Sequence, residues 1–294
     1  MTTKRKTTKA KSRKRKSQNK INIRTRIISL IWSALIIGIL TIITRNLNGC
    51  NDTANYGLSH IEHLDVVATA DGIPEKIICY EGMNISFNPD LHIPNWVAWE
   101  LTAEESLGDE PRAKNFACDE SVDGCAKPWD YSYSGYDRGH MAPAGDMKWS
   151  RNAMQQSFYM TNICPQVGAL NSGAWKRLEE KCRTWAQCDS AITIVAGPIL
   201  TDNLTETIGE SHVAVPKRFF KVIVSPYSKP PKGIAFIMNN GRVEGGLQNT
   251  ATTIDNVEFI TGHDFFQTLP DSFENEIESQ CRFHYWSTLT PKQK

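Results

Sequence analysis

The chain has 294 residues, 40% of them hydrophobic, which is enough for one large domain or two small ones with a packed core. Its formal net charge of +1 conceals a division. Residues 1–45 hold 13 Lys and Arg and no Asp or Glu, which leaves 20 basic and 32 acidic residues in the remainder. An excess of acidic residues beyond residue 45 excludes general binding of polyanions by that part of the chain. Any contact with nucleic acid would need a local basic groove.

The N-terminal segment is predicted to anchor the chain in a membrane. Residues 1–26 carry twelve Lys and Arg and are expected to form a basic arm, and residues 27–44 are an uncharged apolar run that can just span a bilayer. A cleavable signal peptide is the alternative, but its apolar region should be shorter and a small-residue cleavage site should follow. We expect an uncleaved signal anchor. The positive-inside rule then places residues 1–26 in the cytoplasm and residues 46–294 on the periplasmic or extracellular side.

Residues 45–75 are polar and mixed, and they are predicted to be a linker into a domain at 76–290. Residues 102–135 are rich in Asp, Glu, Gly and Ser and are expected to form a long surface loop. The expected strands are 77–80, 96–101, 191–196, 219–224 and 233–238; the expected helices are 149–160, 171–187 and 253–261. Because strands and helices do not alternate strictly, the pattern favours the α+β class over a doubly wound sheet.

Eight cysteines are present, and none has the spacing of a zinc site. On the outer side of a membrane some of them would form disulfides. Cys118 and Cys125, which close a short loop, are the expected pair. Cys182 and Cys188 lie six residues apart on a predicted helix and point in different directions, so their pairing would require the helix to end early.

The most informative stretch begins at Asp137-Arg-Gly-His140. A neutral histidine with an ordinary pKa can accept a proton from water at pH 7, and Gly139 lets backbone or substrate approach closely. A lone histidine is more often structural, but Arg138 beside His140 and the polar residues downstream favour a catalytic one. Tyr159, Asn162 or a backbone carbonyl could orient the ring, and the sequence does not choose among them.

Asn171, Glu179 and Arg183 follow on or near a predicted helix. Asn171 or Ser172 could be its N-cap; alternatively, the Asn171 amide oxygen could bind Mg²⁺, which favours oxygen ligands and keeps several waters. Glu179 and Arg183 are four residues apart and share a helix face. As an ordinary pair they would form a surface salt bridge worth under about 1 kcal/mol. As a functional pair, Glu179 would hold water on the metal and Arg183 would reach phosphate.

Further basic and acidic residues have weaker signals. Arg112, Lys114, Lys217 and Arg218 could contact phosphate, although a solvated surface role is the ordinary reading of each. Asp137 and Asp146 are expected to support the backbone around His140.

Three segments together resemble the DNA/RNA non-specific endonuclease family, which includes secreted bacterial nucleases and mitochondrial endonuclease G. They are Asp137-Arg-Gly-His140, Asn162-Ile-Cys-Pro-Gln166 and Leu170-Asn-Ser-Gly-Ala-Trp-Lys-Arg-Leu-Glu179. The resemblance runs from about Tyr80 to Phe266 and is most specific over 136–183. It implies a ββα-metal nuclease fold, in which helices flank a central antiparallel sheet and the catalytic histidine lies on a finger with one Mg²⁺.

The resemblance also implies a role for each residue. His140 would be the general base, Asn171 the metal ligand, and Glu179 would reach the metal through water. Arg138 and Arg183 would bind phosphate. A further family arginine lies in an Arg-Asn-aromatic pattern, which reads Lys114-Asn-Phe116 here with Arg112 two residues earlier. Both stay open as the substrate-binding residue, and a lysine lacks the bidentate fork of arginine.

The sequence therefore predicts a Mg²⁺-dependent endonuclease, with Mn²⁺ as a possible substitute, that cleaves DNA and RNA with little sequence preference. The resemblance to the family implies products that end in a 5′ phosphate. Two alternatives remain: a membrane-tethered nucleic-acid-binding protein with a weak or inactive site, and a phosphodiesterase for small diesters. The sequence leaves the oligomeric state open, with a homodimer among the possibilities.

Overall fold

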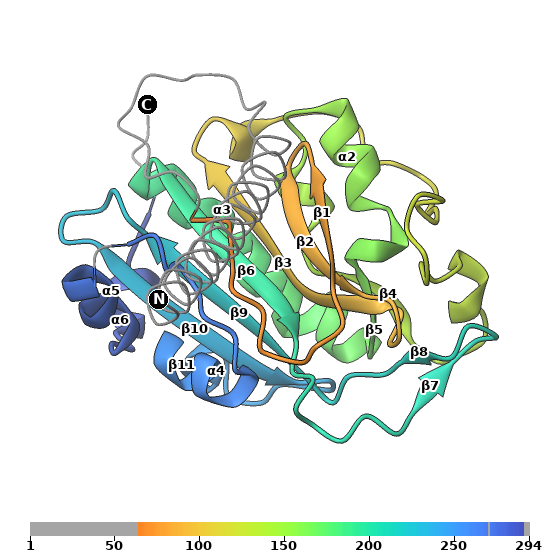
Figure 1. Cartoon of the computed structure of the whole chain (residues 1–294). Coiled ribbons are helices and arrows are strands. Elements are labelled where there is room, and N and C mark those ends of the chain that lie inside the picture. Colours follow the sequence, from red (N-terminus) through yellow and green to blue (C-terminus); the bar gives the residue numbers. More distant parts are fainter. Residues whose placement is uncertain (1–63, 270, 291–294) are drawn as a thin grey trace, which may run out of the picture. The chain divides into compact units, whose positions relative to one another are not determined.

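The apolar runs of the sequence pair into one antiparallel sheet. The computed structural model describes residues 64–269 and 271–290, and in them seven strands pair in the order β1-β2-β3-β6-β9-β10-β11 (Figure 1). Their bounds are β1 Lys76–Tyr80, β2 Met83–Asn88, β3 Ile93–Thr102, β6 Ala191–Pro198, β9 Arg218–Ser225, β10 Lys232–Asn239 and β11 Ala251–Thr252. Every pairing is antiparallel, so the predicted central antiparallel sheet is confirmed.

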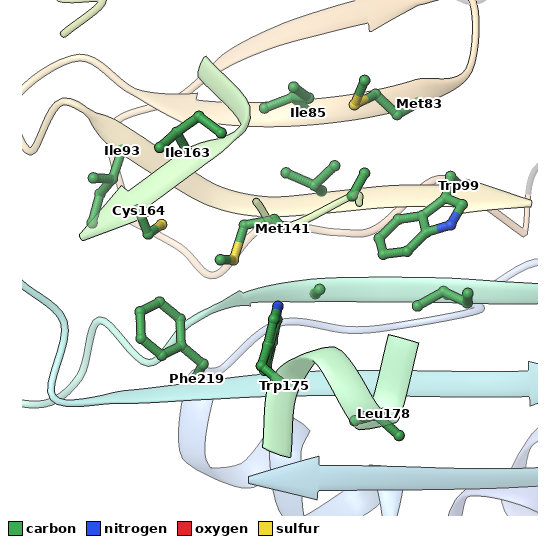
Figure 2. Packing of buried hydrophobic residues seen from close by; sticks show 14 of the residues in the cluster. Met83, Ile85, Ile93, Trp99, Met141, Ile163, Cys164, Trp175, Leu178 and Phe219 are labelled. Atoms are coloured by element: carbon green, nitrogen blue, oxygen red, sulfur yellow. The ribbon is translucent and has the colours of Figure 1, made fainter. Parts of the chain in front are cut away.

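The two faces of the sheet bury separate layers of side chains, because successive residues of a strand point to opposite faces. On β9, Phe219 belongs to one layer and Phe220 to the other. Figure 2 shows part of the first layer, in which Trp175 and Leu178 come from the helical segment, Phe219 lies beside Trp175, and Met141 and Trp99 lie across from them. The rings of Trp175 and Phe219 have centroids 5.8 Å apart.

Helices cover both layers. The described α-helices are α2 Arg151–Ser157, α3 Lys176–Asp189, α4 Ile254–Thr261, α5 Asp271–Glu278 and α6 Phe283–Ser287. Helix α3 buries Leu178, Cys182 and Trp185 in the first layer, as its apolar spacing predicts. Helices α4 and α5 pack beside β10 and contribute to the second layer (Figure 1).

A smaller two-stranded unit lies next to β3. Strands β4 (Asp137–His140) and β5 (Ile163–Gln166) pair antiparallel, and β5 leads into a π-helical turn, η5 (Leu170–Trp175), which continues as α3. Two antiparallel strands followed by a helix therefore carry the segments 137–140 and 171–183. A short hairpin, β7 (Thr207–Ile208) with β8 (Val213–Ala214), and the 3₁₀ turns Glu105–Leu107, Pro128–Tyr131, Ala144–Asp146, Met160–Asn162 and Leu247–Thr250 complete the elements.

Several expected boundaries differ from the structure. The helix expected at 149–160 is shorter and begins after Ser150, which caps it by accepting hydrogen bonds from the backbone of Asn152 and Ala153. Strands β2, β4 and β5 were not expected from the alternation pattern. Residues 64–75, expected in the linker, pack with the domain, since Leu64 and Val67 are buried in the second layer and Ala68 pairs with Asp264.

The expected disulfide between Cys118 and Cys125 is wrong, because both are free thiols and the Cys118 Sγ instead donates to the carbonyl oxygen of Cys125. Cys182 and Cys188 are also free, on a helix that does not end early. Cys79 on β1 is disulfide-bonded.

The basic arm (1–26) and the apolar run (27–44) lie outside the described residues. Among the helices that the structure describes, none is both long enough and apolar enough to cross a membrane.

Candidate active site

His140 ends β4, and its imidazole is enclosed by aromatic rings. The ring centroid lies 5.3 Å from that of Phe116 and 4.9 Å from that of Phe158, and the residue is only 8% exposed. Burial, together with the nearby charge of Arg112, lowers the pKa of His140 to about 3, so the ring is neutral at pH 7. Its Nε2 is shut off from solvent and has no hydrogen-bond partner among the described residues. A neutral imidazole with a vacant nitrogen can take up a proton.

Within the described residues, no hydrogen bond joins the His140 ring to Tyr159, Asn162 or a backbone carbonyl, the orienting partners considered from the sequence. Asn162 is buried and holds the chain after His140 instead. Its Oδ1 accepts from the backbone of Ala142, and its Nδ2 donates to the carbonyls of Ala142 and Ser157. Aromatic packing therefore fixes the imidazole, and Asn162 fixes the backbone that follows it.

Asn171 lies in η5, and its side chain caps no helix, so the N-cap reading of this residue is wrong. Its Nδ2 donates to the Oδ2 of Asp137 at the start of β4, over 3.0 Å. That carboxylate acceptor identifies the donor end of the amide and leaves Oδ1 available as a ligand atom. Four residues on, Trp175 donates from Nε1 to the carbonyl oxygen of His140, over 3.1 Å. These two bonds bring Asn171 and His140 to one junction between β4 and η5.

Glu179 and Arg183 do not form the expected surface salt bridge. Arg183 pairs with the buried Asp146 instead, with Nη1 2.8 Å from Oδ1. Trp99 donates from Nε1 to the other oxygen of Asp146, so this carboxylate ties the loop after His140 to β3 and α3, as its predicted supporting role requires. Glu179 is partly buried beside this pair. Burial raises the pKa of Glu179 to about 7, and the charges of Lys221 and Arg183 oppose that rise.

The arginines expected to bind phosphate differ in burial and in the contacts that they make. Arg138 is partly buried; its Nε and Nη2 donate to the Pro128 carbonyl, and its guanidinium lies over the rings of Phe116 and Tyr131. Arg112 is exposed and places its guanidinium 4.9 Å from the centroid of Phe158, whose ring edge meets His140. Lys114 is exposed and makes none of these contacts within the described residues.

Of the two remaining basic candidates, Arg218 is engaged by a bidentate pair with Asp202, with Nε–Oδ2 2.9 Å and Nη2–Oδ1 2.6 Å. Lys217 is exposed. Among Arg112, Lys114, Lys217 and Arg218, the structure thus places Arg112 beside His140, through the ring of Phe158.

A comparison with protein-family models matches residues 64–272 to the DNA/RNA non-specific endonuclease family. The chain belongs to this family. Mitochondrial endonuclease G of Bos taurus is 30% identical over 229 residues, which are 73% of this chain and 72% of the bovine protein. The mitochondrial nuclease of Saccharomyces cerevisiae is 36% identical over 234 residues, which are 71% of this chain and 69% of the yeast protein.

The mitochondrial nuclease EXOG of Mus musculus, another family member, is 34% identical over 220 residues, or 69% of this chain. The chain spans only 59% of the length of that mouse protein. Among solved structures, a chain in the crystal structure of an EndoG/EndoGI complex matches with a TM-score of 0.56 and 29% identity. That match covers 67% of this chain and 87% of the other.

Sequence reasoning missed one residue of this endonuclease domain that the structure places at its centre. Lys221 on β9 is fully buried, with Nζ 4.5 Å from the ring centroid of Trp175 and 4.9 Å from that of Trp99. The same Nζ donates to the carbonyl oxygen of Met141, the residue after His140, over 3.4 Å. A charged residue inside the apolar run Phe219-Phe-Lys-Val-Ile-Val224 was the signal that could have revealed it.

Proposed function

We propose that this chain is a metal-dependent endonuclease that hydrolyses the phosphodiester backbone of DNA and RNA with little sequence preference. The observation that carries the proposal is the junction of β4 and η5. There, a neutral histidine with an unpartnered Nε2 is bonded through its backbone to the same helical turn that presents the Asn171 amide oxygen. Family membership supports the same reading.

His140 acts as the general base. A pKa of about 3 in the free protein keeps the ring unprotonated and ready to accept. A phosphodiester next to the ring adds negative charge, which raises the pKa of the imidazole toward the range in which it transfers protons efficiently at neutral pH. The rings of Phe116 and Phe158 keep the imidazole in one orientation while the proton moves.

The donor set fits Mg²⁺ or Mn²⁺. Asn171 offers a hard amide oxygen and Glu179 offers carboxylate oxygens, which are the ligand atoms that these ions prefer. We infer that Asn171 holds the ion and that Glu179 positions water around it. The ion would supply Lewis-acid stabilisation of the leaving 3′ oxygen.

Arg112, Arg138 and Arg183 neutralise charge on the scissile phosphate in this proposal. The Pro128 carbonyl holds Arg138 through Nε and Nη2, which leaves Nη1 for a phosphate oxygen, and Arg183 is oriented by Asp146. All three would contact phosphate oxygens, which are the same at every base pair. That is the physical reason to expect weak sequence preference and activity on both DNA and RNA.

We further propose that residues 27–44 anchor the protein in a membrane, with the nuclease domain on the periplasmic or extracellular side. The support is the uncharged run of 18 residues and the imbalance of charge beside it: twelve basic residues precede it in 1–26, and one follows it in 45–75. Protease added to intact spheroplasts is expected to degrade the domain. A domain that stays protected until the membrane is lysed would overturn the orientation.

The decisive experiment for the activity is incubation of the purified protein with plasmid and with RNA, with Mg²⁺ or with EDTA, in wild-type and His140→Ala forms. We expect cleavage of both substrates by the wild type with Mg²⁺ only, and a loss of at least about 100-fold in the variant. His284→Ala, which removes an exposed imidazole distant in sequence, is the matched control and should keep full activity. Near-normal cleavage by a folded His140→Ala variant would refute the assigned base.

A further inference from the structure

A cluster of carboxylates lies where α4 and α5 meet, outside the junction of β4 and η5. The two helices pack on β10 through Ile254, Val257 and Ile277 of the second core layer. Asp255 and Glu258 come from α4, and Glu278 is the last residue of α5. One oxygen of each carboxylate lies within 4.8 Å of the other two.

Glu278 is the informative member, because its side chain is buried without compensation. The residue is 6% exposed, and its Oε1 is closed to solvent with no hydrogen-bond partner in residues 64–269 and 271–290. A buried carboxylate oxygen without a partner is costly, so such groups are normally paired with a cation or a donor. Here the carboxylate that carries the unpaired oxygen comes from α5 and lies beside the carboxylates of Asp255 and Glu258 from α4.

The neighbouring charges make the need for a cation stronger. Burial raises the pKa of Glu278 to about 9, and the negative charges of Glu258, Glu274, Asp255 and Asp264 add to that rise. Glu258 uses one oxygen, Oε1, to accept from the backbone of Phe265 over 2.9 Å, which fixes the carboxylate and leaves its second oxygen for the cluster. The site is therefore partly preorganised by the fold.

The geometry points to a divalent-cation site formed by Asp255, Glu258 and Glu278, which ties α5 to α4. The ligands are all carboxylate oxygens, with no histidine or thiol among them, which disfavours Zn²⁺. Ca²⁺ accepts six to eight oxygens in irregular arrangements and completes its shell with water, whereas Mg²⁺ demands a near-ideal octahedron. Ca²⁺ is therefore the ion that fits a half-exposed carboxylate cluster between two helices. The site is separate from the proposed nuclease centre and does not depend on it.

The test is a calorimetric titration of calcium into the full-length chain, which is kept in detergent and first treated with a chelator. Calcium is raised to about 10 mM, above the dissociation constants of the weakest extracellular calcium sites. We expect a binding event that raises the Tm, and at least tenfold weaker binding in Glu278→Gln and Asp255→Asn. Asp255 is exposed, so its variant is expected to fold even if Glu278→Gln does not. Glu276→Gln, an exposed carboxylate on the same helix, is the matched control and should bind like the wild type.

Asn171→Ala should keep this calcium event, because it alters the nuclease centre alone; this separates the two proposals. Equal calcium affinity in the wild type, Glu278→Gln and Asp255→Asn would overturn the site. A second outcome would also overturn the site: the Tm of the wild type does not change with calcium, and Glu278→Gln has a higher Tm than the wild type. A proton shared between the carboxylates, rather than a cation, would then stabilise the cluster.

Discussion

Lys221 shows how a single buried charge can hold a site together. Its ammonium lies between the faces of Trp99 and Trp175 and reaches the backbone just after His140. The carboxylates of Glu179 and Asp146 act on it, and burial lowers its pKa against their effect. Lys221 and Arg183 together balance two acidic side chains that the fold has largely removed from water.

Replacing Lys221 with Met is expected to lower the free energy of unfolding by about 3 kcal/mol, because removal of one partner leaves buried carboxylate charge uncompensated. Adding Glu179→Gln to Lys221→Met should recover part of that loss. Chemical denaturation of the wild type, the two single variants and the double variant measures the coupling free energy between the two residues. Lys221→Arg, which keeps the charge, serves as the comparison. Strictly additive losses would mean that Lys221 and Glu179 do not interact.

Asn171 makes a prediction about metal requirement. Asn171→Ala should raise the Mg²⁺ concentration for half-maximal cleavage by roughly tenfold or more, because the ligand oxygen is lost. Ser172→Ala changes the exposed neighbour and should leave the Mg²⁺ dependence as it is. An unchanged requirement in Asn171→Ala would assign Asn171 a purely structural bond to Asp137.

The residues of the proposed centre could be predicted from the sequence, but the residues with which they form hydrogen bonds and ion pairs could not. His140, Asn171 and Glu179 stand in motifs with short spacing, so a local pattern is enough to select them. The pairing of Arg183 with Asp146 crosses 37 residues and depends on how α3 docks. Lys221 comes from a distant strand, and only the alternation along β9 places it on the side of α3.

At the level of elements, β4 and β5 were hard to predict because they are four residues each and lack a clean alternation of polar and apolar side chains. Their packing explains the glycine in Asp137-Arg-Gly-His140. A Cβ added at Gly139 would lie within 2.6 Å of the Gln166 side chain, on the opposing strand, which is fully buried.

Gly139→Ala is therefore expected to destabilise the domain by about 1–3 kcal/mol through overpacking against Gln166. Shortening the opposing side chain should relieve the clash, so the Gly139→Ala, Gln166→Ala double variant should be more stable than the sum of the two single losses predicts. Thermal or chemical denaturation measures both. Gly241→Ala, where a Cβ meets open space, is the control. A Gly139→Ala variant as stable as wild type would show that the hairpin tolerates the methyl group.

The contact between α4 and α5 makes a prediction about pH. The pKa of Glu278 is about 9 in the folded protein against 4.5 for an ordinary glutamate, so the folded state holds a proton that the unfolded state has lost. Unfolding releases that proton between these pH values, and stability falls as pH rises. In EDTA, the Tm is expected to fall by a few degrees from pH 7 to pH 9.

Glu278→Gln cannot ionise and should flatten this dependence, whereas Glu276→Gln should keep it. Saturating calcium should flatten it in the wild type, because the bound ion replaces the proton. A Tm that is constant from pH 7 to pH 9 in EDTA would contradict the buried, proton-bearing state of Glu278.

At the scale of the molecule, the α+β fold class and most strands of the sheet could be predicted from the apolar runs of the sequence. The order of the strands in the sheet could not. Long-range order depends on which strand edges meet, and a single sequence carries no direct record of that. The strand β3 lies between β2 and β6, which are separated in the chain by more than a hundred residues. The helices α5 and α6 also escaped prediction, because eight and five residues are too few to show a clear helical periodicity.

The uneven charge of the chain sets an expectation for binding to DNA as a function of salt. Only Arg112, Arg138 and Arg183 are proposed to contact phosphate, while the body beyond residue 45 carries 20 basic and 32 acidic residues. Each neutralised phosphate contributes a slope of about −0.9 to a plot of log K against log salt. A His140→Ala form that lacks residues 1–26 should therefore bind duplex DNA with a slope of about −3 or shallower.

Arg112→Ala in that form should make the slope shallower by about 1, and Lys114→Ala should leave it unchanged, because the guanidinium of Arg112 is the one placed beside His140 through Phe158. Fluorescence anisotropy between low and high salt measures the slope. A value near −6 without the basic arm would mean that a broad surface, rather than a few arginines around one phosphate, binds the nucleic acid. The acidic body would then need a basic face that these three residues do not explain.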